Sequence, residues 1–223
     1  MAFSYSPKIV TDGLVLYLDA GNSLSYPGSG NSWTDLSRSR TNAVLNNGPT
    51  FSNGSIVFDG VDDYVNLPPY TINGYSYTYE VVGKFGNNST YIMDHETPRI
   101  VLGVSPDGTG NMYTYNKIAY YPNGPSWEAF GTYPMGDNLF HIITYTIDNG
   151  TMKAYLDGVQ SGNTANGASV YIGTSSTPVT LMSRYSVSNF KSGTLASFKI
   201  YNRALTSQEV QQNYNALKTR FGL

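Results

Sequence analysis

Residues 139–157 read LFHIITYTIDNGTMKAYLD, and this stretch decides the fold class. Asn149-Gly150 stands between two runs in which apolar and polar residues alternate. An Asn-Gly pair in that position is typical of a two-residue hairpin turn, because both residues tolerate positive φ. The turn fixes the register and places three apolar pairs on one face: Ile147 with Met152, Tyr145 with Ala154, and Ile143 with Leu156. We therefore expect one face to pack inward and the other to stay polar, as in a two-sheet sandwich.

Further runs with β-strand character follow one another along the chain, without an internal repeat or a linker. They cover residues 14–19, 54–59, 64–67, 75–85, 90–94, 99–104 and 111–121. One helix is predicted after them, because Thr206 and Glu209 fit a capping box. Its apolar stripe consists of Val210, Tyr214, Leu217 and Phe221. We expect an all-β antiparallel sandwich of about ten strands with one C-terminal α-helix, divided into an N-terminal arm of residues 1–12 and a domain of residues 13–223.

The composition excludes several classes of protein. Charged residues are only 13% of the 223 residues, whereas Tyr supplies 20 and Gly 23, a mixture that disfavours helical bundles and coiled coils. The net charge of −2, without any run of Lys or Arg, argues against nucleic-acid binding. We expect no membrane insertion and no secretion signal, because apolar runs are short throughout. The absence of cysteine excludes disulfides and thiolate metal sites.

Five segments, in this order, carry a family resemblance. They are residues 13–20 (GLVLYLDA), 56–65 (IVFDGVDDYV), 153–158 (KAYLDG), 171–173 (YIG) and 198–206 (FKIYNRALT). With them the chain resembles the laminin-G-like members of the concanavalin A-like lectin/glucanase jelly rolls. The resemblance implies two curved antiparallel sheets whose concave face or rim loops bind sugars, and it does not imply catalysis. The ending of residues 212–222, with the opening block, resembles versions of this domain in bacteriophage tail or capsid appendages.

An aromatic segment carries the predicted binding site. Sugars stack their C–H faces on aromatic rings while amides take their hydroxyls. The predicted ligand-binding residues are Tyr120, Tyr121, Trp127, Tyr133, Asn116 and Asn123. Two alternatives stay open, since such rings also serve as core residues or as protein-contact residues.

The acidic residues argue against an enzyme. The glutamates are Glu80, Glu96, Glu128 and Glu209, and they do not form the paired acids that glycoside hydrolysis needs. We expect Asp94-His95-Glu96 to be a solvated charge cluster in a turn. His141 is expected to be half-buried and bonded to a backbone carbonyl or a Tyr hydroxyl.

One dense group of carboxylates is a candidate metal site. Asp59, Asp62 and Asp63, with Asp19 as an extra ligand, have the oxygen chemistry of a Ca²⁺ site. We favour the alternative that they shape a turn through side-chain-to-backbone bonds, and so expect no metal and no cofactor. The sequence departs from the family at two positions: Phe140 replaces a Trp of many relatives, and Ser197 replaces an acidic residue. The Ser197 departure puts a family-type calcium site in doubt.

Function follows from these observations as an expectation. A non-enzymatic virion surface protein of a bacteriophage, either a capsid decoration or a tail appendage, would assemble in the host cytoplasm and display a lectin-like domain toward cell-surface glycans. Its partners would be other virion proteins and a host polysaccharide, and an oligomer is compatible with the sequence. The arm, with Phe3, Tyr5 and Pro7, suits docking on the particle. The alternatives are a free-standing carbohydrate-binding module and, less favoured, a glycoside hydrolase.

Overall fold

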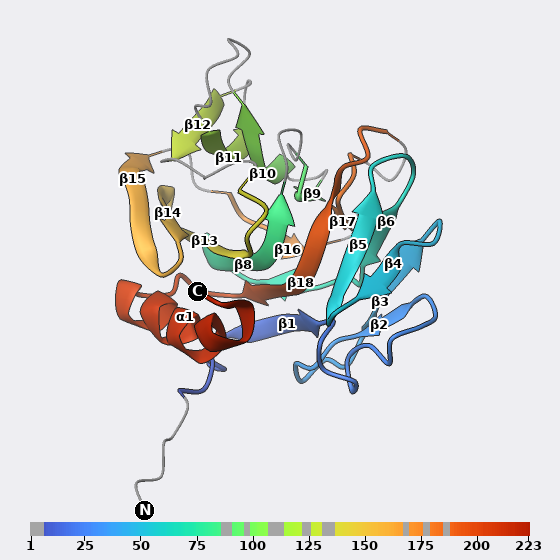
Figure 1. The fold of residues 1–223 in the computed structure, drawn as a ribbon. Coiled ribbons are helices and arrows are strands. Elements are labelled where there is room, and N and C mark those ends of the chain that lie inside the picture. The colour runs from blue at the N-terminus through green and yellow to red at the C-terminus, as the bar shows by residue number, and fades with distance from the viewer. Residues whose placement is uncertain are drawn as a thin grey trace, which may run out of the picture.

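A computed structural model describes residues 7–85, 91–95, 99–106, 114–121, 126–130, 137–166, 170–175, 179–184 and 188–223. These residues form two eight-stranded antiparallel sheets, a small two-stranded sheet and one α-helix. Figure 1 shows the two large sheets as layers, with the helix α1 (Ser207–Phe221) against one of them. The all-β sandwich with a C-terminal helix is therefore confirmed. The strands of the described residues number eighteen rather than about ten, because several have only two or three residues.

The first sheet has the strand order β15-β14-β13-β8-β18-β5-β4, and β1 also pairs with β18. Its strands are β1 (Leu14–Asp19), β4 (Thr50–Ser52), β5 (Ser55–Asp59), β8 (Ser76–Phe85), β13 (His141–Asp148), β14 (Thr151–Leu156), β15 (Val159–Asn166) and β18 (Ser192–Tyr201).

The second sheet has the order β12-β11-β10-β9-β17-β6-β3-β2. Its strands are β2 (Ser32–Thr34), β3 (Asn42–Asn46), β6 (Tyr64–Leu67), β9 (Met93–His95), β10 (Arg99–Pro106), β11 (Thr114–Tyr121), β12 (Ser126–Phe130) and β17 (Val179–Leu181). The small sheet pairs β7 (Thr71–Ile72) with β16 (Gly173–Thr174).

The predicted hairpin is β13 and β14, and its register is confirmed pair by pair from Asp148↔Thr151 to Ile143↔Leu156. Asn149 and Gly150 have φ values of 47° and 86°, as a type I′ turn requires. The inward side chains of this hairpin meet those of the second sheet in one large core. Trp33 is fully buried there.

The helix has a cap at each end, and the first is the capping box that the sequence predicts. The Thr206 hydroxyl accepts from the Glu209 N–H at 3.3 Å, and the Glu209 carboxylate accepts from the Thr206 N–H at 2.9 Å. Gly222 closes the helix with φ 72°, a left-handed conformation that glycine adopts without strain. Among the described residues, no helix is long and apolar enough to cross a membrane.

The outer face of the first sheet corrects one expectation. The polar face of the hairpin was expected to stay open, yet Thr144 and Thr146 are both buried. The reason is that α1 covers this face through an apolar cluster that includes Ile142, Leu217 and Phe221. Polar side chains beneath α1 must therefore find partners within the protein.

Residues 8–10 dock on the same face. The Val10 N–H donates to Asn213 Oδ1 at 2.8 Å, and the Val10 carbonyl accepts from the Tyr201 hydroxyl at 3.1 Å. Gln212 donates to the Lys8 carbonyl at 2.8 Å. Residues 8–10 are thus bound to α1 and β18, whereas Phe3 and Tyr5 of the arm lie outside the described residues, and the boundary at residue 12 stays a prediction.

Candidate functional site

The predicted sugar platform lies at one edge of the second sheet. Trp127 pairs in register with Ala119, and Tyr120 pairs with both Ser126 and Ile100. Tyr121 pairs with Arg99, and Asn116 with Phe130. Four of the predicted residues thus lie on two adjacent strands, three on β11 and Trp127 on β12. The side chains of these four residues lie outside the described part of the chain, and so do all atoms of Asn123 and Tyr133. The role of the six residues in sugar binding therefore stays a prediction.

The charge cluster at Asp94-His95 is a correction. Both residues were expected in a solvated turn, but both are buried in β9. The reason is the position of β9, which pairs with β10 on one side and with β17 on the other, inside the second sheet. Glu96 lies outside the described residues. A buried, strand-held aspartate and histidine are structural parts of the sheet rather than a surface cluster.

The aspartate turn between β5 and β6 does bring three carboxylates together. Oxygens of Asp59, Asp62 and Asp63 lie within 4.8 Å of one another. Two of the carboxylates are used locally: Asp63 Oδ2 accepts from the Asp59 N–H at 3.0 Å, and Asp59 Oδ1 accepts from the Val61 N–H at 2.7 Å. Burial raises the pKa of Asp63, and the nearby Asp59 and Asp62 charges act in the same direction. These are the side-chain-to-backbone bonds that shape a turn.

Asp19 does not join this group. Its two carboxylate oxygens lie 2.8 Å from the guanidinium of Arg220 on α1, and Tyr17 donates to it at 2.9 Å. Burial disfavours the charged carboxylate, but the hydrogen bond and charge of Arg220 outweigh burial and lower the pKa of Asp19. Asp19 therefore fastens α1 to β1, which corrects its assignment as an extra metal ligand.

Glu80 is one of the glutamates considered for catalysis, and the fold uses it internally. Glu80 on β8 and Lys199 on β18 are directly opposite in register, with Oε1 and Nζ 2.8 Å apart and both side chains fully buried. Asn213 of α1 donates to Glu80 Oε2 at 2.9 Å. A substrate has no route to a carboxylate that is enclosed by an ammonium, an amide and a helix.

Glu209 is held as firmly at the start of α1. Arg203 donates to its two oxygens at 2.6 and 2.9 Å, in addition to the capping contacts with Thr206. The hydrogen bonds from Arg203 are the main cause that lowers the pKa of Glu209 to about 2. A general acid needs the opposite, a carboxyl that keeps its proton near neutral pH. Glu96 and the side chain of Glu128 lie outside the described residues.

His141 was expected to be half-buried but is buried, and its partners are not the expected ones. Its Nδ1 lies 2.7 Å from Asp157 Oδ2, and its Nε2 lies 2.9 Å from Asp137 Oδ2. Burial works against the charged ring, yet the hydrogen bonds to Asp157 and Asp137 outweigh it and raise the pKa of His141. Asp157 Oδ1 also accepts from the Ile142 N–H at 2.9 Å. These hydrogen bonds join the end of β14 to the start of β13. The partners of His141 are thus two carboxylates and not the predicted backbone carbonyl or Tyr hydroxyl.

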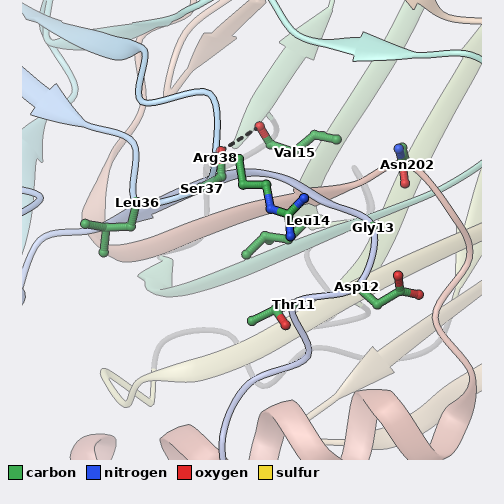
Figure 2. A pocket seen from close by; sticks show the side chains of 9 residues that line it. All are labelled: Thr11, Asp12, Gly13, Leu14, Val15, Leu36, Ser37, Arg38 and Asn202. Carbon is green, nitrogen blue, oxygen red and sulfur yellow. Dashed lines mark hydrogen bonds between the residues drawn. The ribbon is translucent and has the colours of Figure 1, made fainter.

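Figure 2 shows a hollow that the sequence did not predict, with a volume of about 570 Å³. It opens between residues 11–15 and residues 36–38, and Asn202 completes it. The Ser37 hydroxyl donates to the Val15 carbonyl at 3.1 Å and so fixes one wall. Asp12, at another wall, pairs with Arg203 at 2.8 Å. The lining is mixed, with hydroxyl, carboxylate, guanidinium and amide groups beside Leu14 and Leu36.

The chain matches a known protein family. A family model described as the concanavalin A-like lectin/glucanases superfamily matches residues 59–211, which is more than half of the chain. Comparison with curated protein sequences returned no match.

Solved structures with the same fold come from different proteins. Domain 4 of AbnA, an extracellular GH43 arabinanase from Geobacillus stearothermophilus in complex with arabinotriose, has a TM-score of 0.68 at 18% identity, over 92% of this chain and 100% of that chain. A Trypanosoma rangeli sialidase has a TM-score of 0.64 at 17% identity, over 99% of this chain and 36% of the sialidase. The receptor binding domain of a botulinum neurotoxin C/D mosaic serotype has a TM-score of 0.66 at 12% identity, over 92% of this chain and 51% of that chain.

Proposed function

The chain belongs to the concanavalin A-like lectin/glucanase superfamily, and from that premise we propose that it is a non-catalytic carbohydrate-binding protein displayed on the surface of a bacteriophage particle. The observation that carries the binding part is the likeness to AbnA domain 4, which is matched over its whole length and whose structure contains arabinotriose. That domain is one part of a larger enzyme, so the same architecture serves there as a separate unit beside other domains.

The placement of Glu80 and Glu209 supports the absence of catalysis. Glycoside hydrolysis needs two carboxyl groups about 5–10 Å apart across the scissile bond, one of them able to donate a proton. Glu80 is enclosed under α1, and Glu209 is held ionised by Arg203. The test is release of reducing sugar from β-glucan, chitin and arabinan. We expect none, and release that disappears in Glu96→Gln or Glu128→Gln would contradict the proposal.

Sugar binding at β10–β12 has a direct spectroscopic test, because the chain has two tryptophans, Trp33 and Trp127. Trp33 is fully buried, and its indole N–H has no hydrogen-bond partner among the described residues, so Trp33→Phe removes a core fluorophore without removing a hydrogen bond. In that background Trp127 is the reporter. We expect arabinotriose or another neutral oligosaccharide to change its emission, and we expect Trp127→Ala to weaken binding. If no glycan changes the Trp127 emission, the proposal that sugars bind at this surface is refuted.

Display on a phage particle is supported by the resemblance of the opening and closing segments to phage appendage domains. It predicts that residues 1–7, with Phe3, Tyr5 and Pro7, dock on another virion protein. Their deletion preserves the Lys8 carbonyl and both Val10 hydrogen bonds, so we expect unchanged melting. Incorporation into particles should then fall sharply. Normal incorporation would favour the alternative, a free-standing carbohydrate-binding module.

A further inference from the structure

Lys191 is a buried lysine without a counter-ion among the described residues. It lies just before β18 and is only 7% exposed, and its backbone N–H donates to the Met182 carbonyl at 2.8 Å. The side-chain ammonium makes no hydrogen bond and no ion pair with any residue that the structure describes. Burial lowers the pKa of Lys191, and no described carboxylate offsets that effect. A buried ammonium usually has anionic or carbonyl partners, because its removal from water is costly without them.

Nearby charged groups do not supply the missing partner. Lys199, further along β18, is also buried, but Glu80 lies 2.8 Å from its ammonium. Ser192, the neighbour of Lys191, pairs in register with Asp59. The aspartates of that turn nevertheless form no ion pair with Lys191 and do not raise its pKa. The fold thus neutralises Lys199 within the protein and leaves Lys191 with an uncompensated positive charge.

A tyrosine ring lies between the ammonium and a second cation. Lys191 Nζ is 5.6 Å from the ring centroid of Tyr91, and the guanidinium carbon of Arg184 is 5.9 Å from the same centroid. The ring attracts a cation, but both distances are near the outer limit of about 6 Å for that interaction. The ring also leaves the N–H groups of the ammonium without acceptors. The contact with Tyr91 therefore orients Lys191 and does not replace a counter-ion.

Backbone hydrogen bonds hold these three residues in place. The Met182 N–H donates to the carbonyl of Ile92, the residue after Tyr91, at 3.1 Å. Arg184 and Ser188 exchange two backbone hydrogen bonds, of 2.9 and 3.2 Å. With the bond from Lys191 to Met182, these contacts connect the start of β9 to the segment between β17 and β18. The positive charges are therefore set in position before any ligand arrives.

The ammonium is not sealed inside the protein. Described side-chain atoms that are fully enclosed and lack a hydrogen bond, such as Trp33 Nε1, do not include Lys191 Nζ. The nitrogen therefore keeps contact with solvent, although the rest of the side chain is buried. An ammonium held in this way at an opening, with unused N–H donors, forms strong charge-assisted hydrogen bonds to an anion that reaches it.

We propose that Lys191 binds one oxyanionic group of a ligand, a carboxylate or a sulfate, with the Arg184 guanidinium adding positive potential beside it. The net charge of −2 gives the chain no long-range attraction for polyanions, so a single group held by short-range hydrogen bonds is the ligand chemistry that fits. The site uses none of the predicted sugar-binding residues and therefore does not depend on the proposed function. Two sources supply such a group, a free anion and an acidic sugar, and the experiment separates them.

The experiment titrates the full chain with a matched series of sugars that differ at one carbon: galactose, galacturonate and galactose 6-sulfate. Inorganic sulfate is the free-anion probe, and sodium chloride keeps the ionic strength constant. We expect the amide NMR signals of Met182 and Lys191 to shift with the charged probes and not with galactose. Lys191→Met should weaken the binding of the charged probes about tenfold or more.

A matched control is Lys218→Met. Lys218 also lies over a tyrosine ring, with its Nζ 5.5 Å from the Tyr214 centroid, but it donates to Asn215 Oδ1 at 2.8 Å. Its replacement should leave the affinity for the charged probes unchanged.

Thermal stability without any added anion separates a binding role from a structural one. Methionine keeps most of the length of Lys191 and removes an uncompensated buried charge, so Lys191→Met should melt at the same temperature as the wild type or higher. A clear fall in melting temperature, or failure to fold, would overturn the proposal, because the ammonium would then be satisfied within the protein.

The remaining outcomes identify the source of the anion and separate this site from the proposed function. Tighter binding of galacturonate or galactose 6-sulfate than of inorganic sulfate supports the site with an acidic sugar as the source, and the reverse order supports it with a free anion. Signals that no charged probe shifts, or equal affinities in Lys191→Met, would overturn the site. If arabinotriose changes the Trp127 emission in that case, the proposed function stands without it.

Discussion

Replacement of Glu80 by glutamine should destabilise the protein far more than its similar size suggests. Glu80 and Lys199 form an ion pair of 2.8 Å in which both side chains are fully buried, and Asn213 donates to the same carboxylate at 2.9 Å. Glutamine presents an NH₂ group in place of one oxygen, so it cannot accept from both donors. With that NH₂ group turned toward Lys199, the ammonium would keep two weak partners, the Ser197 hydroxyl at 3.3 Å and the Tyr17 ring, whose centroid lies 5.0 Å away.

The expected loss follows from that geometry. Removing one partner of a buried ion pair costs about 3–5 kcal/mol, because the other charge stays buried without compensation. For a domain of this size, such a loss corresponds to a fall in melting temperature of roughly 10 °C. Urea unfolding and calorimetry of Glu80→Gln measure both quantities. A loss below about 1 kcal/mol would refute the reasoning, since only an exposed pair is worth so little.

Two controls sharpen this prediction. The double variant Glu80→Leu with Lys199→Met removes both charges, so it should regain most of the loss. A deficit of about 1 kcal/mol should remain, because Asn213 Nδ2 keeps its hydrogen bond to the Tyr201 hydroxyl at 3.0 Å but loses the one to Glu80. Asp12→Asn disrupts a pair of the same kind at the surface, where the Asp12 side chain is 85% exposed. It should change the free energy of unfolding by less than about 1 kcal/mol.

Three other predictions concern pH, metal and backbone. The pKa of His141 is raised in the folded protein, so the stability that the charged ring contributes is complete below the unfolded pKa of about 6.5. That contribution is lost as the pH rises through the folded pKa. His141→Gln should therefore lower the melting temperature more at about pH 5.5 than at about pH 8.5. Chelation of calcium with EDTA should leave the melting temperature unchanged, because the Asp59 and Asp63 carboxylates already accept backbone N–H groups, and a clear fall would indicate a bound ion. Gly83→Ala should prevent stable folding, as judged by circular dichroism, because its Cβ would lie 2.5 Å from the Thr194 carbonyl oxygen.

Features set by neighbours in sequence were predictable. The Asn149-Gly150 turn and the Thr206–Glu209 capping box each depend on a few adjacent residues, and both have the expected geometry. The ion pair on the outer face of the first sheet was not predictable in the same way. Glu80 and Lys199 are 119 positions apart, and they meet because β8 pairs with β18. No local pattern specifies that pairing.

The sites show the same division between local and distant contacts. The sequence placed sugar-binding chemistry on the aromatic run around Trp127, but it gave no sign of the hollow between residues 11–15 and residues 36–38. Those two segments lie together because the Leu36 N–H donates to the Tyr17 carbonyl at 2.8 Å. His141 was misjudged although the signal was local, because continuing the predicted hairpin register one pair beyond Ile143↔Leu156 brings Asp157 opposite Ile142, next to His141.

The central position of β18 has a consequence for synthesis in the cell. This strand pairs with β8, β5 and β1. The strands on its two sides therefore cannot join into one sheet until residues 192–201 have left the ribosome. At about 5–20 residues per second, the earlier strands wait with unpaired edges for a time that is long compared with hairpin formation. Slow translation late in the chain, or heat during expression, should therefore divert nascent protein into aggregates, whereas finished protein should resist the same temperature.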